Sequence, residues 1–272
     1  LGRWAAPLYF GLAVLAISVR PPEKKPFVVT GRVKRQFAAA ALLLLITGAV
    51  GLIVPAPWRF VYTAAIAGLP IAVWLPLLSG RMTEGMEKKI ADGFVKAAKE
   101  KLAASGVTVI GVTGSYGKTS VKYILTEMLR DTFDTLMTGG SYNTTMGVVR
   151  TVNEEMTPFN QVFVCEMGAR QKGDIAEICD IVRPKYGIIT SVGIAHLETF
   201  GSTENIRAAK FELAQAIPED GLIFLNYDSS PIAASGWERP PVSYGLNTTS
   251  DSRAADISYD IAGAKFTLIC PD

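Results

Sequence analysis

The glycine-rich turn TGSYGKTS at 113–120 constrains the fold of this chain more than any other segment. A β-branched run, VTVIGV at 107–112, precedes it, and a helical pattern, VKYILTEMLR at 121–130, follows it. Strand, glycine-rich turn and helix in this order are typical of a phosphate-binding loop. The strict pattern of such loops would place glycine at Val112, so the alternative is an ordinary turn between a strand and a helix.

The residue types in this turn suit the phosphates of a nucleotide. Glycine allows backbone N–H groups to close around phosphate oxygens, and the N-terminus of the next helix adds partial positive charge. Lys118 would place a cation on the β- and γ-phosphates, and Thr119 would offer its hydroxyl to Mg²⁺, which prefers oxygen ligands. The predicted nucleotide-binding residues are Gly114, Ser115, Gly117, Lys118, Thr119 and Ser120.

Strand and helix patterns alternate after this loop. Short apolar runs at 161–165, 186–191 and 221–226 predict strands, and helical patterns lie at 174–182 and 203–217. Such alternation predicts an α/β fold with a mostly parallel sheet covered by helices. Because ligands bind at the carboxyl ends of strands in these sheets, residues that follow strands are expected to share one site.

Three residues beyond the loop could contribute to such a site. Glu166 ends an apolar strand, where a carboxylate is costly unless it is paired or bound to a cation. His196 is the only histidine of the chain, and Lys210 follows it in a helical pattern. Each has an ordinary alternative: a strand-end acid without a ligand, a packed or surface histidine, and a solvated lysine.

The first eighty residues are unusually apolar. Uncharged runs predict two or three membrane spans, at about 37–57 and 60–79 and, in a shorter run, at about 4–19, since a bilayer core of about 30 Å needs about 20 apolar residues in a helix. A buried core helix is the alternative, or a cleaved signal peptide for the first run. Six Lys and Arg residues lie in 20–36, and the positive-inside rule puts this loop in the cytoplasm. These patterns predict a multi-pass cell-membrane protein, with the lipid bilayer as a partner and everything after Gly80 in the cytoplasm.

Charge divides the chain in the same place. Residues 1–80 hold eight Lys and Arg against one Glu, whereas the remainder holds 19 against 24 acidic residues. We therefore expect a membrane-spanning region at 1–80, a connector helix at 81–104 and an ATP-binding domain at 105–272.

With 49% hydrophobic residues the chain is not a disordered or nucleic-acid-binding tail, and no nucleic-acid partner is expected. Three separated cysteines without a CxxC pair fit a reducing compartment.

Five motifs together resemble the Mur ligase family, whose members are ATP-dependent amide-forming enzymes of peptidoglycan precursor synthesis. The motifs are GVTGSYGKTS at 111–120, SYNTTMG at 141–147, CEMGARQKGDI at 165–175, ITSVGIAHLETFGSTENI at 189–206 and AAKFEL at 208–213. The resemblance covers about residues 105–272 and implies the central P-loop domain of such a ligase. It also implies that the domain is incomplete at KFTLICPD and that the chain as given would not complete catalysis alone.

The resemblance implies a role for each candidate residue. The catalytic residues would be Lys118, His196 and Lys210, the last carried as a carbamate. The ligands of Mg²⁺ would be Thr119, Glu166 and, for a second ion, His196. Asn143 and Thr144 would lie beside the acceptor substrate and the γ-phosphate of ATP.

The implied function is an ATP-dependent ligase that activates a carboxylate as an acyl phosphate and joins it to an amine. The resemblance favours addition of D-alanyl-D-alanine to a UDP-muramoyl tripeptide, so the expected partners are a UDP-muramoyl peptide and an amino acid or dipeptide. Two alternatives remain at this point. One is a ligase acting on a lipid-linked or other cell-envelope acceptor, and the other is a nucleotide-binding membrane subunit without catalysis of its own.

Overall fold

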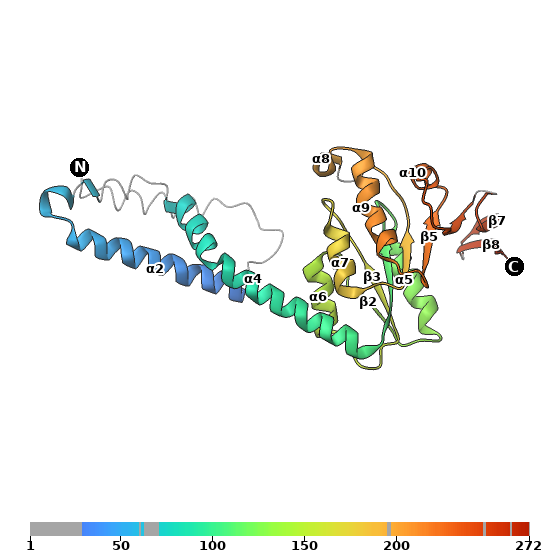
Figure 1. Ribbon diagram of the computed structural model, residues 1–272, viewed down its shortest axis with the longest axis horizontal. Coiled ribbons are helices and arrows are strands. Elements are labelled where there is room, and N and C mark those ends of the chain that lie inside the picture. The colour runs from blue at the N-terminus through green and yellow to red at the C-terminus, as the bar shows by residue number, and fades with distance from the viewer. Residues whose placement is uncertain are drawn as a thin grey trace. The chain divides into compact units, whose positions relative to one another are not determined.

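The computed structural model describes residues 29–59, 61–62, 71–194, 197–246, 249–261 and 263–271 (Figure 1). The chain divides into two compact units, Leu1–Lys89 and Ile90–Asp272.

The first unit contains helix α2 (Gly31–Ile53) and the first part of the long helix α4 (Ile71–Ser105). Helix α2 begins after Thr30, whose hydroxyl accepts a hydrogen bond from the Val33 amide at 3.4 Å. An N-cap of this kind satisfies one of the amide groups that have no partner within the helix. The Arg35 guanidinium makes a bidentate ion pair with Glu87, at 2.6 and 2.9 Å, and so ties α2 to α4.

The two or three predicted membrane spans are not confirmed. Among the described residues one helix, α2, is long and apolar enough to cross a bilayer, and it covers the predicted span at 37–57. The predicted span at 4–19 lies outside the described residues, and the one at 60–79 lies only partly within them. The predicted connector at 81–104 is helical and forms part of α4.

The second unit is built on a sheet with eight strands among the described residues, in the order β2-β3-β1-β4-β5-β6-β7-β8. All neighbouring strands are parallel except β7 and β8, which form an antiparallel pair at the end of the sheet (Figure 1). The strands are β1 (Thr108–Thr113), β2 (Thr135–Met137), β3 (Val162–Glu166), β4 (Tyr186–Ile189), β5 (Leu222–Asn226), β6 (Val242–Gly245), β7 (Ser252–Asp260) and β8 (Gly263–Ile269). The predicted α/β fold with a mostly parallel sheet is confirmed.

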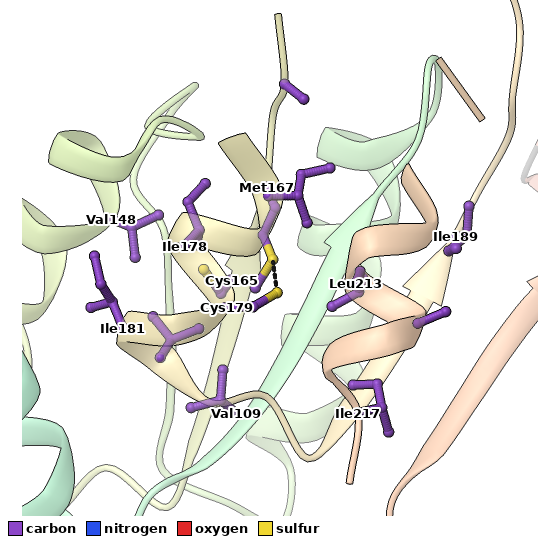
Figure 2. Close-up of a cluster of buried hydrophobic side chains, with 14 of the residues drawn as sticks. Val109, Val148, Cys165, Met167, Ile178, Cys179, Ile181, Ile189, Leu213 and Ile217 are labelled. Carbon is purple, nitrogen blue, oxygen red and sulfur yellow. Dashed lines mark hydrogen bonds between the residues drawn. The ribbon is translucent and has the colours of Figure 1, made fainter. Parts of the chain in front are cut away.

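Helices cover both faces of this sheet. They are the end of α4 together with α5 (Lys118–Arg130), α6 (Thr145–Glu154), α7 (Asp174–Val182), α8 (Leu197–Phe200), α9 (Thr203–Ala216) and α10 (Ser230–Ala233). The larger core fills the space between the sheet and helices α6, α7 and α9, and Figure 2 shows its centre, where the Cys179 thiol lies 3.8 Å from the Met167 sulfur. A smaller cluster packs under α5 on the other face.

The alternation of side chains along β3 decides which face receives Glu166. Phe163 and Cys165 belong to the larger core, whereas Val162 and Val164 belong to the cluster under α5. Successive residues of a strand point to opposite faces, so Glu166 shares the α5 face with Val162 and Val164. The strand therefore directs this carboxylate toward the helix that follows the glycine-rich turn.

Helix α9 packs against the sheet at two strand positions that are glycine. A Cβ at Gly111 would lie 2.6 Å from the Leu213 side chain, and one at Gly187 would lie 3.2 Å from it. Real Cβ atoms do not come within 2.6 Å of another heavy atom, and 3.2 Å is a tight contact, so a larger residue at either position would force the Leu213 side chain to shift. The two glycines thus bring α9, which also carries Lys210, close to the carboxyl end of β1.

Candidate nucleotide-binding site

The glycine-rich turn lies where a parallel sheet offers its binding crevice. Strands β2 and β3 lie on one side of β1, and β4 and the later strands lie on the other, so the strand order changes direction beside β1. Ligands of open α/β sheets bind outside the carboxyl ends of the strands at such a switch point. The turn at 113–120 leaves the carboxyl end of β1 there.

Two glycines allow the turn to fold as it does. Gly114 has a φ of 151°, and a Cβ at this position would lie 2.0 Å from the Thr190 hydroxyl oxygen. Gly117 has a φ of 81° and is the N-cap of α5. The Ser115 amide donates to the Ser191 carbonyl oxygen at 2.9 Å and fixes the turn against the residues after β4. The amides at the start of α5 have no carbonyl partner within their helix and are available to an anion.

Lys118 is half-buried at the first position of α5. Its Nζ donates to the Gly114 carbonyl oxygen at 2.7 Å, so the ammonium folds back over the turn. Burial lowers the pKa of this lysine, and the nearby Glu166 carboxylate opposes that shift. The cation is therefore held where the phosphates of a bound nucleotide would meet it.

Glu166 lies at the centre of a buried polar cluster. The Thr119 hydroxyl is 3.2 and 3.1 Å from the two carboxylate oxygens, and the Asn143 amide nitrogen is 3.1 Å from Oε1. The Lys122 ammonium lies 3.1 Å from Oε2, and the Glu166 amide donates to the Thr138 hydroxyl at 3.0 Å. Glu166 is 1% exposed and Lys122 is fully buried, so each charge depends on the other for compensation.

This cluster suits Mg²⁺ bound together with a nucleotide. Thr119 and Glu166 offer a hydroxyl and a carboxylate within hydrogen-bond distance of each other, and both are the oxygen ligands that Mg²⁺ prefers. In the part of the chain that the structure describes, no group of three or more His, Cys, Asp and Glu residues could hold a metal alone. Mg²⁺ commonly takes one or two protein ligands and completes its shell with water and substrate phosphates, so the residues present fit the ion.

A cavity of about 670 Å³ adjoins the turn. Among its lining residues are Ser115, Lys118, Asn143, Thr144 and Lys210, so the structure brings together predicted nucleotide, substrate and catalytic residues. Lys210 is 3% exposed, and its burial, with a smaller contribution from the Lys118 cation, lowers its pKa from 10.5 to about 8. An amine with such a pKa is partly neutral near physiological pH and is a better nucleophile than an ordinary lysine.

Other predicted residues have different surroundings. The Thr144 hydroxyl accepts a hydrogen bond from the Gly147 amide at 3.3 Å, so Thr144 caps the N-terminus of α6 besides lining the cavity. Ser120 is exposed in the first turn of α5 and is not part of the cavity wall. His196 lies outside the described residues, so its metal-binding role stays a prediction.

Sequence reasoning missed Lys122 and Thr138. Lys122 lies four residues after Lys118, and this spacing puts both lysines on one face of α5. This spacing could have identified Lys122, because the same face of α5 packs against the sheet. Thr138 follows the three-residue strand β2, which has too little periodicity to be recognised in the sequence.

The chain is similar to known UDP-N-acetylmuramoyl-tripeptide–D-alanyl-D-alanine ligases. It is 35% identical over 226 residues to the UDP-N-acetylmuramoyl-tripeptide–D-alanyl-D-alanine ligase of Mycobacterium bovis, which is 78% of this chain and 44% of that protein. It is 33% identical over 171 residues to the ligase of the same name from Bacillus subtilis, 63% of this chain and 37% of that protein. A MurF ligase structure from Thermotoga maritima in complex with ADP matches 66% of this chain and 42% of its own, with a TM-score of 0.61 and 31% identity. The chain thus spans less than half of the length of each.

The predicted multi-pass membrane localisation is wrong. The relatives that match most of this chain are named as ligases. Among the described residues one helix, α2, could span a bilayer by length and composition, against the two or three spans expected for the whole chain. A single apolar helix near the N-terminus is weak support for a span, because core helices and signal sequences meet the same criteria. Hydropathy alone misled the prediction: an uncharged run reports apolar composition and does not identify what covers it.

The family model of the Mur ligase middle domain matches residues 112–272. The match begins in β1 and includes the glycine-rich turn, Glu166 and Lys210. It covers more than half of the chain, and the parallel sheet with its turn at the switch point agrees with it. The chain therefore belongs to the Mur ligase family.

Proposed function

We propose that this chain supplies the ATP-binding domain, at about 105–272, of a ligase that adds D-alanyl-D-alanine to a UDP-N-acetylmuramoyl tripeptide. The names of the relatives in Mycobacterium bovis and Bacillus subtilis support this substrate pair. The observation that carries the proposal is the arrangement at the end of β1. There Lys118 covers the turn, Thr119 contacts the Glu166 carboxylate at 3.1 Å, and Lys210 lines the adjoining cavity.

The residues of this arrangement would bind and orient Mg²⁺-ATP. The amides at the start of α5 and the Lys118 ammonium neutralise phosphate charge, and phosphoryl transfer depends chiefly on such neutralisation and on positioning. Thr119 and Glu166 would hold Mg²⁺, and His196 is proposed as a ligand of a second ion. When bound, Mg²⁺ supplies further charge neutralisation at the β- and γ-phosphates.

The proposed reaction joins a carboxylate to an amine in two steps. A carboxylate oxygen of the tripeptide attacks the γ-phosphorus, the bond to the β,γ-bridging oxygen breaks, and ADP leaves with that electron pair. The amine of D-alanyl-D-alanine then attacks the carbonyl carbon of the acyl phosphate, inorganic phosphate leaves, and the amine loses a proton. Asn143 and Thr144 line the cavity where the acceptor would meet the γ-phosphate.

Lys210 is proposed to act as a carbamate. Its neutral amine would attack CO₂ and release a proton, which converts a cation into an anion at the cavity wall. The pKa of about 8 supports this proposal, because a substantial fraction of the amine is neutral in mildly alkaline solution. The anion would then orient a metal or the acceptor beside Lys118.

An assay of phosphate release by the full-length protein tests the proposed function. We expect release that requires ATP, UDP-N-acetylmuramoyl tripeptide and D-alanyl-D-alanine together. Lys118→Ala should lower the rate by at least about a hundredfold, the usual effect of removing one transition-state charge contact. Lys265→Ala, at an exposed position of β8, is the control and should keep the rate. Amide formation that is unchanged in Lys118→Ala would contradict the proposal.

A further inference from the structure

Lys122 has no place in the function proposed above, yet it is the most completely buried cation of the site. Its ammonium lies 3.1 Å from Glu166 Oε2 and donates to the Gly140 carbonyl oxygen at 2.6 Å. The Tyr123 ring centroid is 5.0 Å away. Lys122 thus joins α5, the segment after β2 and the end of β3 at one point, and it cannot reach solvent or the exposed surface of the turn.

Stability alone does not explain a lysine at this position. Removing two charges from water is costly, and a well-packed apolar pair of similar volume is often as stable as a buried ion pair or more stable. The pair exists because Glu166 is charged and buried, and we have assigned Glu166 to the metal. This carboxylate must also be held in place when no metal is bound.

The contacts of Glu166 identify its charged partner. Oε1 accepts hydrogen bonds from Thr119 and Asn143, and Oε2 accepts from Thr119 and lies against Lys122. Thr119 and Asn143 are neutral donors, so Lys122 is the one full positive charge within hydrogen-bond distance of this carboxylate among the described residues. Lys122 approaches from the buried side, whereas Thr119 is on the exposed side, toward the phosphate-binding turn.

We propose that Lys122 is a positioning residue and the resident counter-ion of Glu166. It holds the carboxylate in the site before the metal arrives, and its charge keeps the affinity of the nucleotide-free site for divalent cations low. The metal then binds strongly only in the company of the nucleotide's phosphates. This inference rests on the proposed function in one respect, which is the assignment of Glu166 to the metal.

The electrostatics of the turn support this order of binding. Lys118 and Lys122 both lie near the single carboxylate Glu166, so a divalent cation that enters alone meets two like charges. Like charges a few ångströms apart repel by several kcal/mol even at an effective dielectric constant of about 20. The polyphosphate of a nucleotide reverses that balance, because it brings several negative charges to Lys118 and the start of α5.

Manganese binding measured by electron paramagnetic resonance tests the inference, with Mn²⁺ alone and with Mn²⁺ plus ADP. We expect the parent chain to bind Mn²⁺ weakly without nucleotide and strongly with ADP. Lys122→Met should bind Mn²⁺ without nucleotide at least about tenfold more tightly, because the competing charge is gone. Lys101→Met is the control, since the Lys101 ammonium donates to the Asn153 carbonyl oxygen at 3.0 Å, away from the site.

Thermal unfolding with and without Mn²⁺ keeps the test valid if Lys122→Met is poorly folded. In EDTA this variant should melt below the parent, because Glu166 is left buried without a counter-ion. Mn²⁺ alone should raise its Tm more than that of the parent. The double variant Lys122→Met/Glu166→Gln should recover most of the Tm in EDTA and show no response to Mn²⁺.

The outcomes separate this inference from the proposed function. If the parent binds Mn²⁺ no better with ADP than without it, the proposed nucleotide and metal site fails. If the parent responds to ADP but Lys122→Met has parental affinity for Mn²⁺ alone, only the role of Lys122 is overturned. Failure of the double variant to recover stability would also overturn it, and would assign Lys122 to packing.

Discussion

Replacement of Lys210 by methionine should stabilise the protein in a pH-dependent way. Lys210 is 3% exposed on α9, and burial together with the Lys118 cation lowers its pKa from 10.5 to about 8. At about 1.36 kcal/mol for each pH unit, this difference corresponds to about 3 kcal/mol. The folded protein bears that penalty whenever the buried amine is protonated.

The sign follows from proton binding in the two states. Below about pH 8 Lys210 is protonated in both states, so the folded state carries the full penalty. Between about pH 8 and 10.5 the unfolded state binds more protons, so the stability of the parent rises with pH. Lys210→Met should therefore be more stable than the parent by up to about 3 kcal/mol near pH 7, and this advantage should shrink as the pH rises.

Urea denaturation of both proteins at several pH values, in buffer free of CO₂, measures this difference. Excluding CO₂ matters because a carbamate would place a new charge on the same nitrogen. Lys172→Met, at an exposed position, is the control and should stay within about 0.5 kcal/mol of the parent. A Lys210→Met variant that is no more stable than the parent near pH 7, or whose difference does not depend on pH, would refute the reasoning.

Two further substitutions test how the site is built. Gly114→Ala would place a Cβ 2.0 Å from the Thr190 hydroxyl oxygen, so the turn must shift, and ADP affinity measured by calorimetry should fall at least about tenfold. Gly93→Ala, on an open face of α4, should leave ADP affinity unchanged, and equal affinities in both variants would contradict the role of the turn. The Glu212 carboxylate accepts hydrogen bonds from the Gly173 and Ala176 amides at 2.6 and 3.0 Å, at the N-terminus of α7. Glu212→Gln should therefore lower the free energy of unfolding by about 0.5–2 kcal/mol in urea denaturation, and a value within error of zero would show that the cap is unimportant.

The parts of the fold that sequence predicted are those with strong local signals. The β-branched run, the glycines and the helical pattern around 113–120 all agree with one another, and β1, the turn and α5 form there. Glu166 was identifiable because a carboxylate that ends an apolar strand needs a partner. The late strands β6, β7 and β8 were not predicted, since β6 has four residues and β7 mixes small and polar residues without a regular alternation.

The remainder of the site depends on contacts between segments distant in sequence. The role of Lys122 depends on its contacts with the Gly140 carbonyl and the Glu166 carboxylate. Both partners are distant from Lys122 in the sequence, so no local pattern predicts these contacts. The lowered pKa of Lys210 likewise depends on α9 lying close to the sheet, which the glycines at 111 and 187 allow. The multi-pass membrane prediction failed for a related reason: it rested on apolar composition alone, which does not identify what surrounds a segment.

A crystal structure of the chain with ADP and Mg²⁺ tests the central claim most directly. We expect the β-phosphate against the amides at the start of α5 and the Lys118 ammonium. We also expect Mg²⁺ about 2.1 Å from the Thr119 hydroxyl oxygen, with the Glu166 carboxylate in its coordination sphere directly or through one water. A nucleotide bound elsewhere on the sheet, or Mg²⁺ without contact to either residue, would contradict the account.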